Sequence, residues 1–137
     1  MQIEGYPSSI IIQGRVKSGL GNFGFWLEKL ADSYALKTGM RFYPGTLNIE
    51  VNEPYTIPLN ATRLETSEYG GTVAVSMVPC AINGRDAFVL RTDANEQGIG
   101  PHPQTIVEIA SDVHLRALFD LHDGDSVELC LPIGGPN

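Results

Sequence analysis

Apolar and polar positions alternate with the period of a β-strand in several short segments. The clearest is 46–51, where Leu47, Ile49 and Val51 alternate with Asn48 and Glu50. Five further segments rich in β-branched and other apolar residues are predicted as strands, at residues 9–17, 72–78, 87–90, 106–110 and 127–131. The pair Asn83-Gly84, which favours a type I′ turn, makes a hairpin of 72–78 and 87–90.

Helical periodicity is confined to residues 27–37. Leu27, Leu30, Ala31 and Tyr34 recur at i, i+3, i+4 and i+7, and Gly39 suits the helix end. We also expect one helical turn at 115–119 and a turn at 123–125. The 15 glycines and 9 prolines are spread along the chain, as in folds built from short elements. The sequence therefore predicts a mainly β fold, a small six-stranded β-barrel with one short helix. We expect a single domain over 1–137 with a flexible tail at 132–137.

Composition narrows the classes of partner. The chain has 9 Lys and Arg against 16 Asp and Glu, a formal net charge of −7. This balance argues against nucleic acid or an anionic membrane as a partner, because both attract clustered positive charge. Cys80 and Cys130 are far apart and form no CxxC pair, so we expect two buried, reduced thiols. The first residues lack the pattern of a signal peptide, which favours a cytoplasmic location. The oligomeric state is left open.

A glycine-rich loop follows the first predicted strand, Ser18-Gly19-Leu20-Gly21-Asn22-Phe23-Gly24. Three glycines in six residues let a backbone approach a ligand closely and turn its N–H groups toward an anion. The loop is neither a Walker A motif nor a dinucleotide-binding fingerprint. It is therefore either a phosphate-binding loop or a plain turn.

Thr46 and Asn48 leave the same face of their predicted strand, opposite Leu47. A hydroxyl and an amide oxygen side by side are neutral oxygen ligands that suit Mg²⁺. The alternative is a turn in which both side chains satisfy local backbone groups.

Glu108 shares a strand face with Ile106 and Ala110. The carboxylate therefore points either into an apolar environment, where it needs a partner such as Arg116, or to a solvated outer face with Val107 and Ile109 inward. His102 either borders this site and relays a proton or lies on the surface. We prefer the surface position. His114 and His122 are expected on the surface.

Taken in order, these segments resemble the CTP-dependent riboflavin kinases of archaea. The matching residues are Ser18-Gly19-Leu20-Gly21, Tyr43-Pro44-Gly45-Thr46-Leu47-Asn48, Glu108-Ile109, Leu115-Arg116 and Asp123-Gly124-Asp125. The match covers about residues 14–131. Its most specific parts are Gly-Thr-Leu-Asn and the spacing from Glu108 to Leu115-Arg116.

The resemblance implies a cradle-loop barrel that transfers the γ-phosphoryl group of CTP to riboflavin, giving FMN. It implies that the nucleotide is bound by Gly19, Leu20, Gly21, Asn22, Phe23 and Gly24 together with Val113, His114, Leu115 and Arg116. It further implies that Thr46 and Asn48 ligate Mg²⁺ and that Thr92 and Glu108 contact the flavin. Glu108 would also orient the acceptor hydroxyl and accept its proton.

Two departures from the family pattern concern the loops. The glycine loop is one residue longer than is usual in the family, and about eight extra residues separate Thr92 from Glu108, forming a longer lid at 93–102. Because this lid borders the acceptor side, two alternatives stand beside riboflavin phosphorylation. One is a CTP-dependent kinase of another small alcohol, and the other is a non-catalytic flavin- or nucleotide-binding module.

Overall fold

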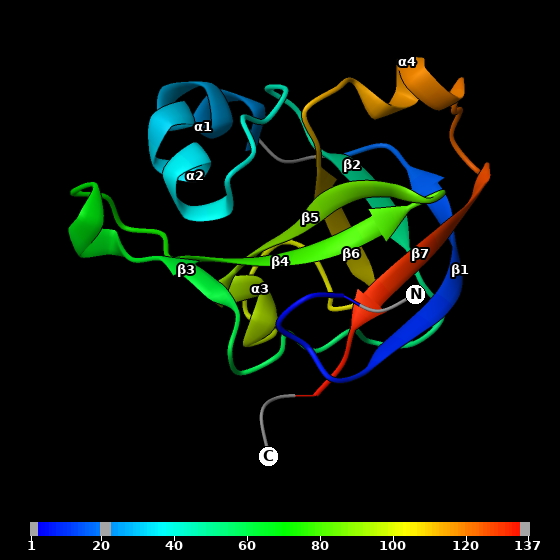
Figure 1. Ribbon diagram of the computed structural model, residues 1–137, viewed down its shortest axis with the longest axis horizontal. Coiled ribbons are helices and arrows are strands. Elements are labelled where there is room, and N and C mark those ends of the chain that lie inside the picture. The colour runs from blue at the N-terminus through cyan, green and yellow to red at the C-terminus, as the bar shows by residue number, and fades with distance from the viewer. Residues whose placement is uncertain (1–2, 20–22, 135–137) are drawn as a thin grey trace.

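Six antiparallel strands close into a barrel, and a seventh extends its sheet (Figure 1). The computed structural model describes residues 3–19 and 23–134. Its strands are β1 (Ser9–Lys17), β2 (Leu47–Glu50), β3 (Thr62–Leu64), β4 (Val75–Ile82), β5 (Arg85–Thr92), β6 (Ile106–Ala110) and β7 (Ser126–Pro132). The order is β3-β4-β5-β6-β2-β1-β7, and β4 also pairs with β7. The start of β4 pairs with β3 and its end with β7, so the barrel closes through one long strand.

The predicted mainly β, six-stranded barrel is confirmed, with some changes in element bounds. β1 and β6 have the predicted bounds, while β4 and β5 continue to the turn at Asn83 and Gly84. Both turn residues have positive φ, 48° and 81°, as a type I′ turn requires. β3 was not predicted, because its three residues show no alternation and gain strand geometry only by pairing with β4.

The predicted single helix is two consecutive helices, and the described residues contain two more. α1 (Phe23–Lys29) and α2 (Ala31–Thr38) meet at Leu30, whose ψ of 28° is not helical. Gly39 ends α2 as predicted, with φ 77° and its N–H donating to Ala35 O. The predicted turn at 115–119 is α4 (Leu115–Phe119), whereas α3 (Asp93–Glu96) and the short 3₁₀ helix η1 (Thr66–Glu68) were not predicted.

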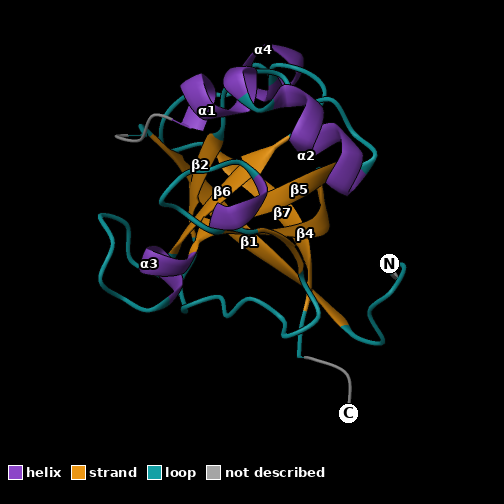
Figure 2. Cartoon of the chain, turned by 90° about the vertical axis from the view of Figure 1, so that its left-hand side faces the viewer, coloured by secondary structure: helices purple, strands orange, loops and turns teal. Residues whose placement is uncertain are grey.

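Apolar side chains pack in two clusters, one inside the barrel and one outside it. The inner cluster includes Val16, Ile49, Val89, Ile109 and Leu129, all fully buried. The outer cluster joins one face of the sheet to α1 and α2 through Leu27, Tyr34, Leu64, Met77 and Leu90, among others. Figure 2 shows α1, α2 and α4 together above the strands, with α3 apart from them. α1 and α2 therefore cover the part of the outer face formed by β3, β4 and β5.

Residues 132 and 133, the start of the predicted tail, contact the barrel. Pro132 belongs to β7 and its carbonyl accepts a hydrogen bond from Tyr55 Oη, at 2.6 Å. The N–H of Ile133 donates to Ser8 O at 3.1 Å. Positions 132 and 133 are thus part of the barrel, while 135–137 lie outside the described residues. Within the described ranges, no helix is both long and apolar enough to cross a bilayer.

Candidate functional site

Strand register places Glu108 and Asn48 side by side on the outer face of the barrel. Asn48 of β2 pairs with Glu108 of β6, and Glu108 in turn pairs with Leu90 of β5. The neighbouring Val107 and Ile109 point into the barrel core, as one of the two sequence alternatives had it. Glu108 is nevertheless only 6% exposed, so its face is not solvated. The carboxylate lies on the outer face beneath other parts of the chain.

Each oxygen of the Glu108 carboxylate has a polar neighbour. Thr46 Oγ1 donates a hydrogen bond to Oε2 at 2.9 Å. His102 Nδ1 lies 3.2 Å from Oε1, at ion-pair distance but without the alignment of a hydrogen bond. Burial raises the pKa of Glu108, and the hydrogen bond from Thr46 and the nearby His102 offset part of that rise. A buried carboxylate with a raised pKa is suited to accepting a proton from a hydroxyl placed against it.

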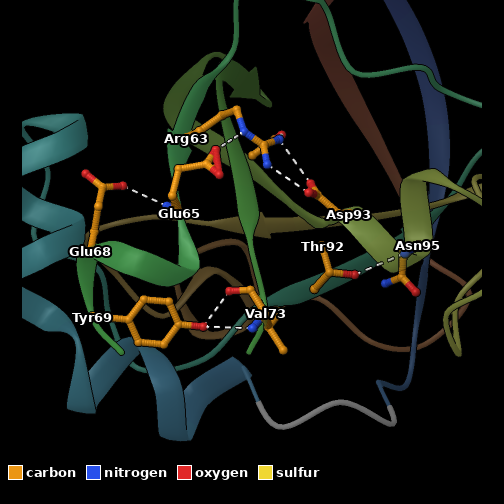
Figure 3. Close-up of polar contacts among 9 residues, drawn as sticks. Arg63, Glu65, Glu68, Tyr69, Val73, Thr92, Asp93 and Asn95 are labelled. Atoms are coloured by element: carbon orange, nitrogen blue, oxygen red, sulfur yellow. Dashed lines mark hydrogen bonds and ion pairs between the residues drawn. The ribbon is translucent and has the colours of Figure 1, made fainter. Parts of the chain in front are cut away.

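His102 is not the surface residue that we preferred. Its side chain is only 11% exposed, because the segment before β6 folds back onto the sheet. The N–H of His102 donates to Asn95 Oδ1 at 3.2 Å. Asn95 N in turn donates to Thr92 Oγ1 at 3.1 Å (Figure 3). Thr92 thus caps α3, and residues 93–102 lead from it toward Glu108. His114 and His122 are exposed, as predicted.

The described end of the glycine loop packs against Asn48. A Cβ atom on Gly19 would overlap Asn48 Nδ2, so only glycine fits this approach without displacing the amide. Farther along, a Cβ on Gly24 would lie 3.0 Å from Pro44 O. Both ends of the loop therefore lie on the segment that carries Thr46 and Asn48. The predicted loop residues Leu20, Gly21 and Asn22 lie outside the described residues.

The residues of the predicted metal pair fit a divalent ion. Asn48 Oδ1 is buried and has no hydrogen-bond partner among the described residues. Such an atom is costly to bury unless something unseen pairs with it. Thr46 Oγ1 uses its proton for Glu108 and keeps its lone pairs. Two neutral oxygens beside a carboxylate form the kind of set that Mg²⁺ binds together with water and phosphate oxygens.

A cavity of about 110 Å³ lies beside Thr46, at the start of α4. We call it the α4 cavity; it is lined by Tyr43, Gly45, Thr46, Leu47, Val113, His114, Leu115 and Arg116. The backbone N–H of Tyr43 donates to Ser111 O at 2.8 Å. This hydrogen bond holds the two walls of the cavity together. The Tyr43 and His114 rings stack with centroids 4.8 Å apart. The structure therefore brings the predicted segment Val113–Arg116 to the predicted metal pair.

Arg116 is held in place by the turn before β7. Its Nη2 lies 2.6 Å from Asp123 Oδ1 and donates to Lys17 O at 3.3 Å. Asp123 also accepts a hydrogen bond from Ser18 Oγ, at the beginning of the glycine loop. These contacts, with Ser18 first and Arg116 next, lower the pKa of Asp123. Asp123 thus joins the two segments that the sequence assigned to nucleotide binding.

A second, mostly apolar cavity of about 130 Å³ lies on the same outer face. We call it the aromatic cavity; it is lined by Phe23, Trp26, Leu30, Tyr34, Leu64, Tyr69, Val73, Val75 and Thr92. Figure 3 shows Tyr69 bonded to the Val73 backbone on one wall and Thr92 on another. Arg63 of β3 holds Asp93, next to Thr92, through two hydrogen bonds of 3.0 and 2.8 Å. Sequence reasoning missed this cavity because it depends on β3 and on the division between α1 and α2.

A family model named for CTP-dependent riboflavin kinases, and described as the domain of unknown function DUF120, matches residues 16–131. The chain belongs to this family. Among curated relatives, the riboflavin kinase of Methanocella arvoryzae is 29% identical over 129 residues, which cover 88% of this chain and 56% of the relative. That of Pyrobaculum aerophilum is 34% identical, with 89% and 60% covered. That of Staphylothermus marinus is 30% identical, with 89% and 92% covered. The chain thus spans 56–60% of the length of the first two relatives.

The predicted site residues that the structure describes do not all lie on the nucleotide side: Phe23, predicted in the nucleotide-binding loop, begins α1 and lines the aromatic cavity. The α4 cavity and Gly19 lie on one side of Thr46 and Asn48, and Glu108 lies directly against them. Thr92 is two residues beyond Leu90 on β5 and therefore shares the face of Glu108. It lies farther from the metal pair than Glu108 does and opens onto the aromatic cavity. His102, which sequence reasoning placed on the surface, lies against Glu108.

Proposed function

We propose that this chain is a Mg²⁺-dependent kinase that transfers the γ-phosphoryl group of CTP to the terminal ribityl hydroxyl of riboflavin, giving FMN and CDP. The observation that carries the proposal is the position of Glu108. Glu108 accepts a hydrogen bond from Thr46, which lines the α4 cavity. Glu108 also shares an outer face of the sheet with Thr92, which lines the aromatic cavity. The family is named for this reaction and the similar curated proteins are riboflavin kinases.

The nucleotide is assigned to the α4 cavity and the glycine loop. Val113, His114, Leu115 and Arg116 would bind its cytidine end, and the loop from Gly19 to Gly24 would place N–H groups against its phosphates. Thr46 Oγ1 and Asn48 Oδ1 would hold Mg²⁺, which offsets phosphate charge during the transfer. In this arrangement the terminal phosphoryl group faces Glu108.

The acceptor is assigned to the other side of Glu108. The isoalloxazine ring would enter the aromatic cavity, where Trp26, Tyr34 and Tyr69 offer apolar surface and Thr92 a hydroxyl. The ribityl chain would then run over Leu90 toward Glu108. Glu108 would orient the terminal hydroxyl for in-line attack and accept its proton as the new phosphate ester forms.

The test is a direct assay of FMN formation. The protein is incubated with riboflavin, Mg²⁺ and either CTP or ATP, and flavins are separated by chromatography. We expect FMN, with CTP preferred. A screen of other polyols by CTP consumption distinguishes a kinase of another alcohol, a possibility that the additional lid residues at 93–102 motivate. Tight binding of CDP or FMN without product from any acceptor would instead indicate a binding module and reject the proposal.

A further inference from the structure

His102 is brought to Glu108 by the extra residues of the 93–102 segment. Its Nδ1 lies 3.2 Å from Glu108 Oε1, while Thr46 Oγ1 bonds the other carboxylate oxygen at 2.9 Å. The two neighbours therefore contact different oxygens of the carboxylate, Thr46 through a hydrogen bond and His102 at ion-pair distance. The side chains of both Glu108 and His102 are largely buried, so water has little access to replace either contact.

The segment that carries His102 is fixed on the barrel at several points. The buried Asn95 accepts from His102 N and donates its own N–H to Thr92 Oγ1. Gly100 lies so close to Asn95 that a Cβ atom would overlap its Oδ1. Glu96, in the same segment, forms an ion pair of 2.9 Å with the buried Arg91. A segment held in this way can maintain a side chain in a defined position.

We propose that His102 is a positioning residue for phosphoryl transfer. It holds the Glu108 carboxylate so that Oε2 faces Thr46 and the carboxylate stays oriented toward the acceptor hydroxyl. The inference rests on the proposed function, and it gives the longer lid a role on the acceptor side of the reaction. The α4 cavity lies on the other side of Thr46, and His102 does not line it.

Removing the imidazole should therefore affect the chemical step and spare the binding of nucleotide. Without His102, the carboxylate is free to rotate about its side-chain bonds while Thr46 bonds one oxygen. We expect His102→Ala to lower kcat by on the order of 10- to 100-fold, the range that loss of a group orienting a metal ligand produces and that a misplacement of about 1 Å produces. The KM for CTP should stay within about threefold of wild type. Asparagine offers an amide nitrogen where histidine has Nδ1, so His102→Asn should recover most of kcat.

The experiment measures kcat and KM for CTP and riboflavin in wild type, His102→Ala, His102→Asn and a control variant. The control is His122→Ala, which removes another histidine near a carboxylate: His122 Nδ1 lies 3.6 Å from Asp125 Oδ2, and the histidine is 75% exposed. We expect wild-type kinetics for the control. Thermal unfolding of each variant shows whether it is folded at the assay temperature.

The possible outcomes separate the two proposals. An active wild type with a kcat loss in His102→Ala and recovery in His102→Asn supports the positioning role. An active wild type with unchanged kcat in His102→Ala overturns it and leaves the proposed function standing. An equal loss in both variants, or a loss expressed mainly in the KM for CTP, also overturns positioning. A wild type that makes no FMN with any nucleotide rejects the proposed function and this inference with it.

Discussion

Gly19 packs so closely on Asn48 that adding one methyl group tests the whole nucleotide side of the site. The φ angle of Gly19 lies outside the left-handed region, so the backbone itself accepts alanine. A Cβ atom there would lie 2.1 Å from Asn48 Nδ2, whereas ordinary contact begins near 3.4 Å. The Asn48 amide must therefore move by more than an ångström, or the loop must lift away from β2. Either response separates the loop from the predicted metal ligand.

The size of the effect follows from that displacement. Misplacing a catalytic group by about 1 Å commonly lowers the rate by on the order of 10²-fold. We therefore expect Gly19→Ala to lower kcat/KM for CTP by about 100-fold, with weaker binding of CDP in the presence of Mg²⁺. Overpacking at a tight site costs about 1–3 kcal/mol of the free energy of unfolding. The end of a side chain can give way here, so the lower end of that range applies.

Gly14 offers a matched control on the same strand pair. A Cβ atom there would lie 2.3 Å from Ile49 Cγ2, so the overlap is similar but falls on a buried methyl group. Gly14→Ala should lose stability and keep kcat/KM for CTP within a few-fold of wild type at a temperature where it is folded. FMN formation gives the kinetics, and titration calorimetry with CDP gives the affinity. A Gly19→Ala variant with wild-type kcat/KM would refute the arrangement of Gly19 against a metal-binding Asn48.

Three further predictions concern other parts of the site. Asn48→Ala should lower kcat by about 100-fold or more and raise the Mg²⁺ concentration needed for half-maximal rate. Mg²⁺ titration of FMN formation measures both, and an unchanged Mg²⁺ concentration for half-maximal rate would contradict the metal assignment. Glu108→Gln should abolish most activity yet be at least as stable as wild type at pH 7. The folded-state pKa of Glu108 is raised, so its contribution to stability falls as pH rises from the unfolded pKa through the folded one. Wild type and Glu108→Gln should therefore be equally stable below about pH 4. Thermal melts across pH test this, and a Glu108→Gln variant less stable than wild type at neutral pH would contradict it. Arg91→Met should cost about 3 kcal/mol or more of the free energy of unfolding in urea, because the buried guanidinium donates to the carbonyls of Tyr55, Gln104 and Ile106; a loss under 1 kcal/mol would contradict its anchoring role.

Local pattern was sufficient for the elements that carry their own periodicity. The alternation around Asn48 located β2, and the β-branched and apolar residues around Glu108 located β6, although both faces of these strands are buried. The Asn83-Gly84 pair located the hairpin because few other residues adopt positive φ at both positions. β3 and the division at Leu30 were not predictable in this way, because both depend on what packs against them.

The site shows the same difference between local and long-range information. Thr46 and Asn48 could be paired from their spacing, since residues two apart on a strand share a face. The contact between Thr46 and Glu108 joins residues 62 positions apart and depends on the register of β2 against β6. His102 was placed on the surface because its neighbours are prolines and polar residues. Long-range contacts of its segment, those of Asn95 and Glu96 among them, bring it to the carboxylate.

The charges around the α4 cavity indicate how a triphosphate would be held by so acidic a chain. Among the described residues lining that cavity, Arg116 is the one lysine or arginine, and its guanidinium is already paired with Asp123. Its charge is therefore largely offset before any ligand arrives, and its position fixes the turn against Ser18 and Lys17. Under the proposed function, most of the phosphate charge would then be met by backbone N–H groups of the glycine loop and by a divalent ion held by Thr46 and Asn48. Such a site depends on the close fit of Gly19 to Asn48 more than on any single lysine or arginine, because that fit sets the distance between the loop and the metal ligands.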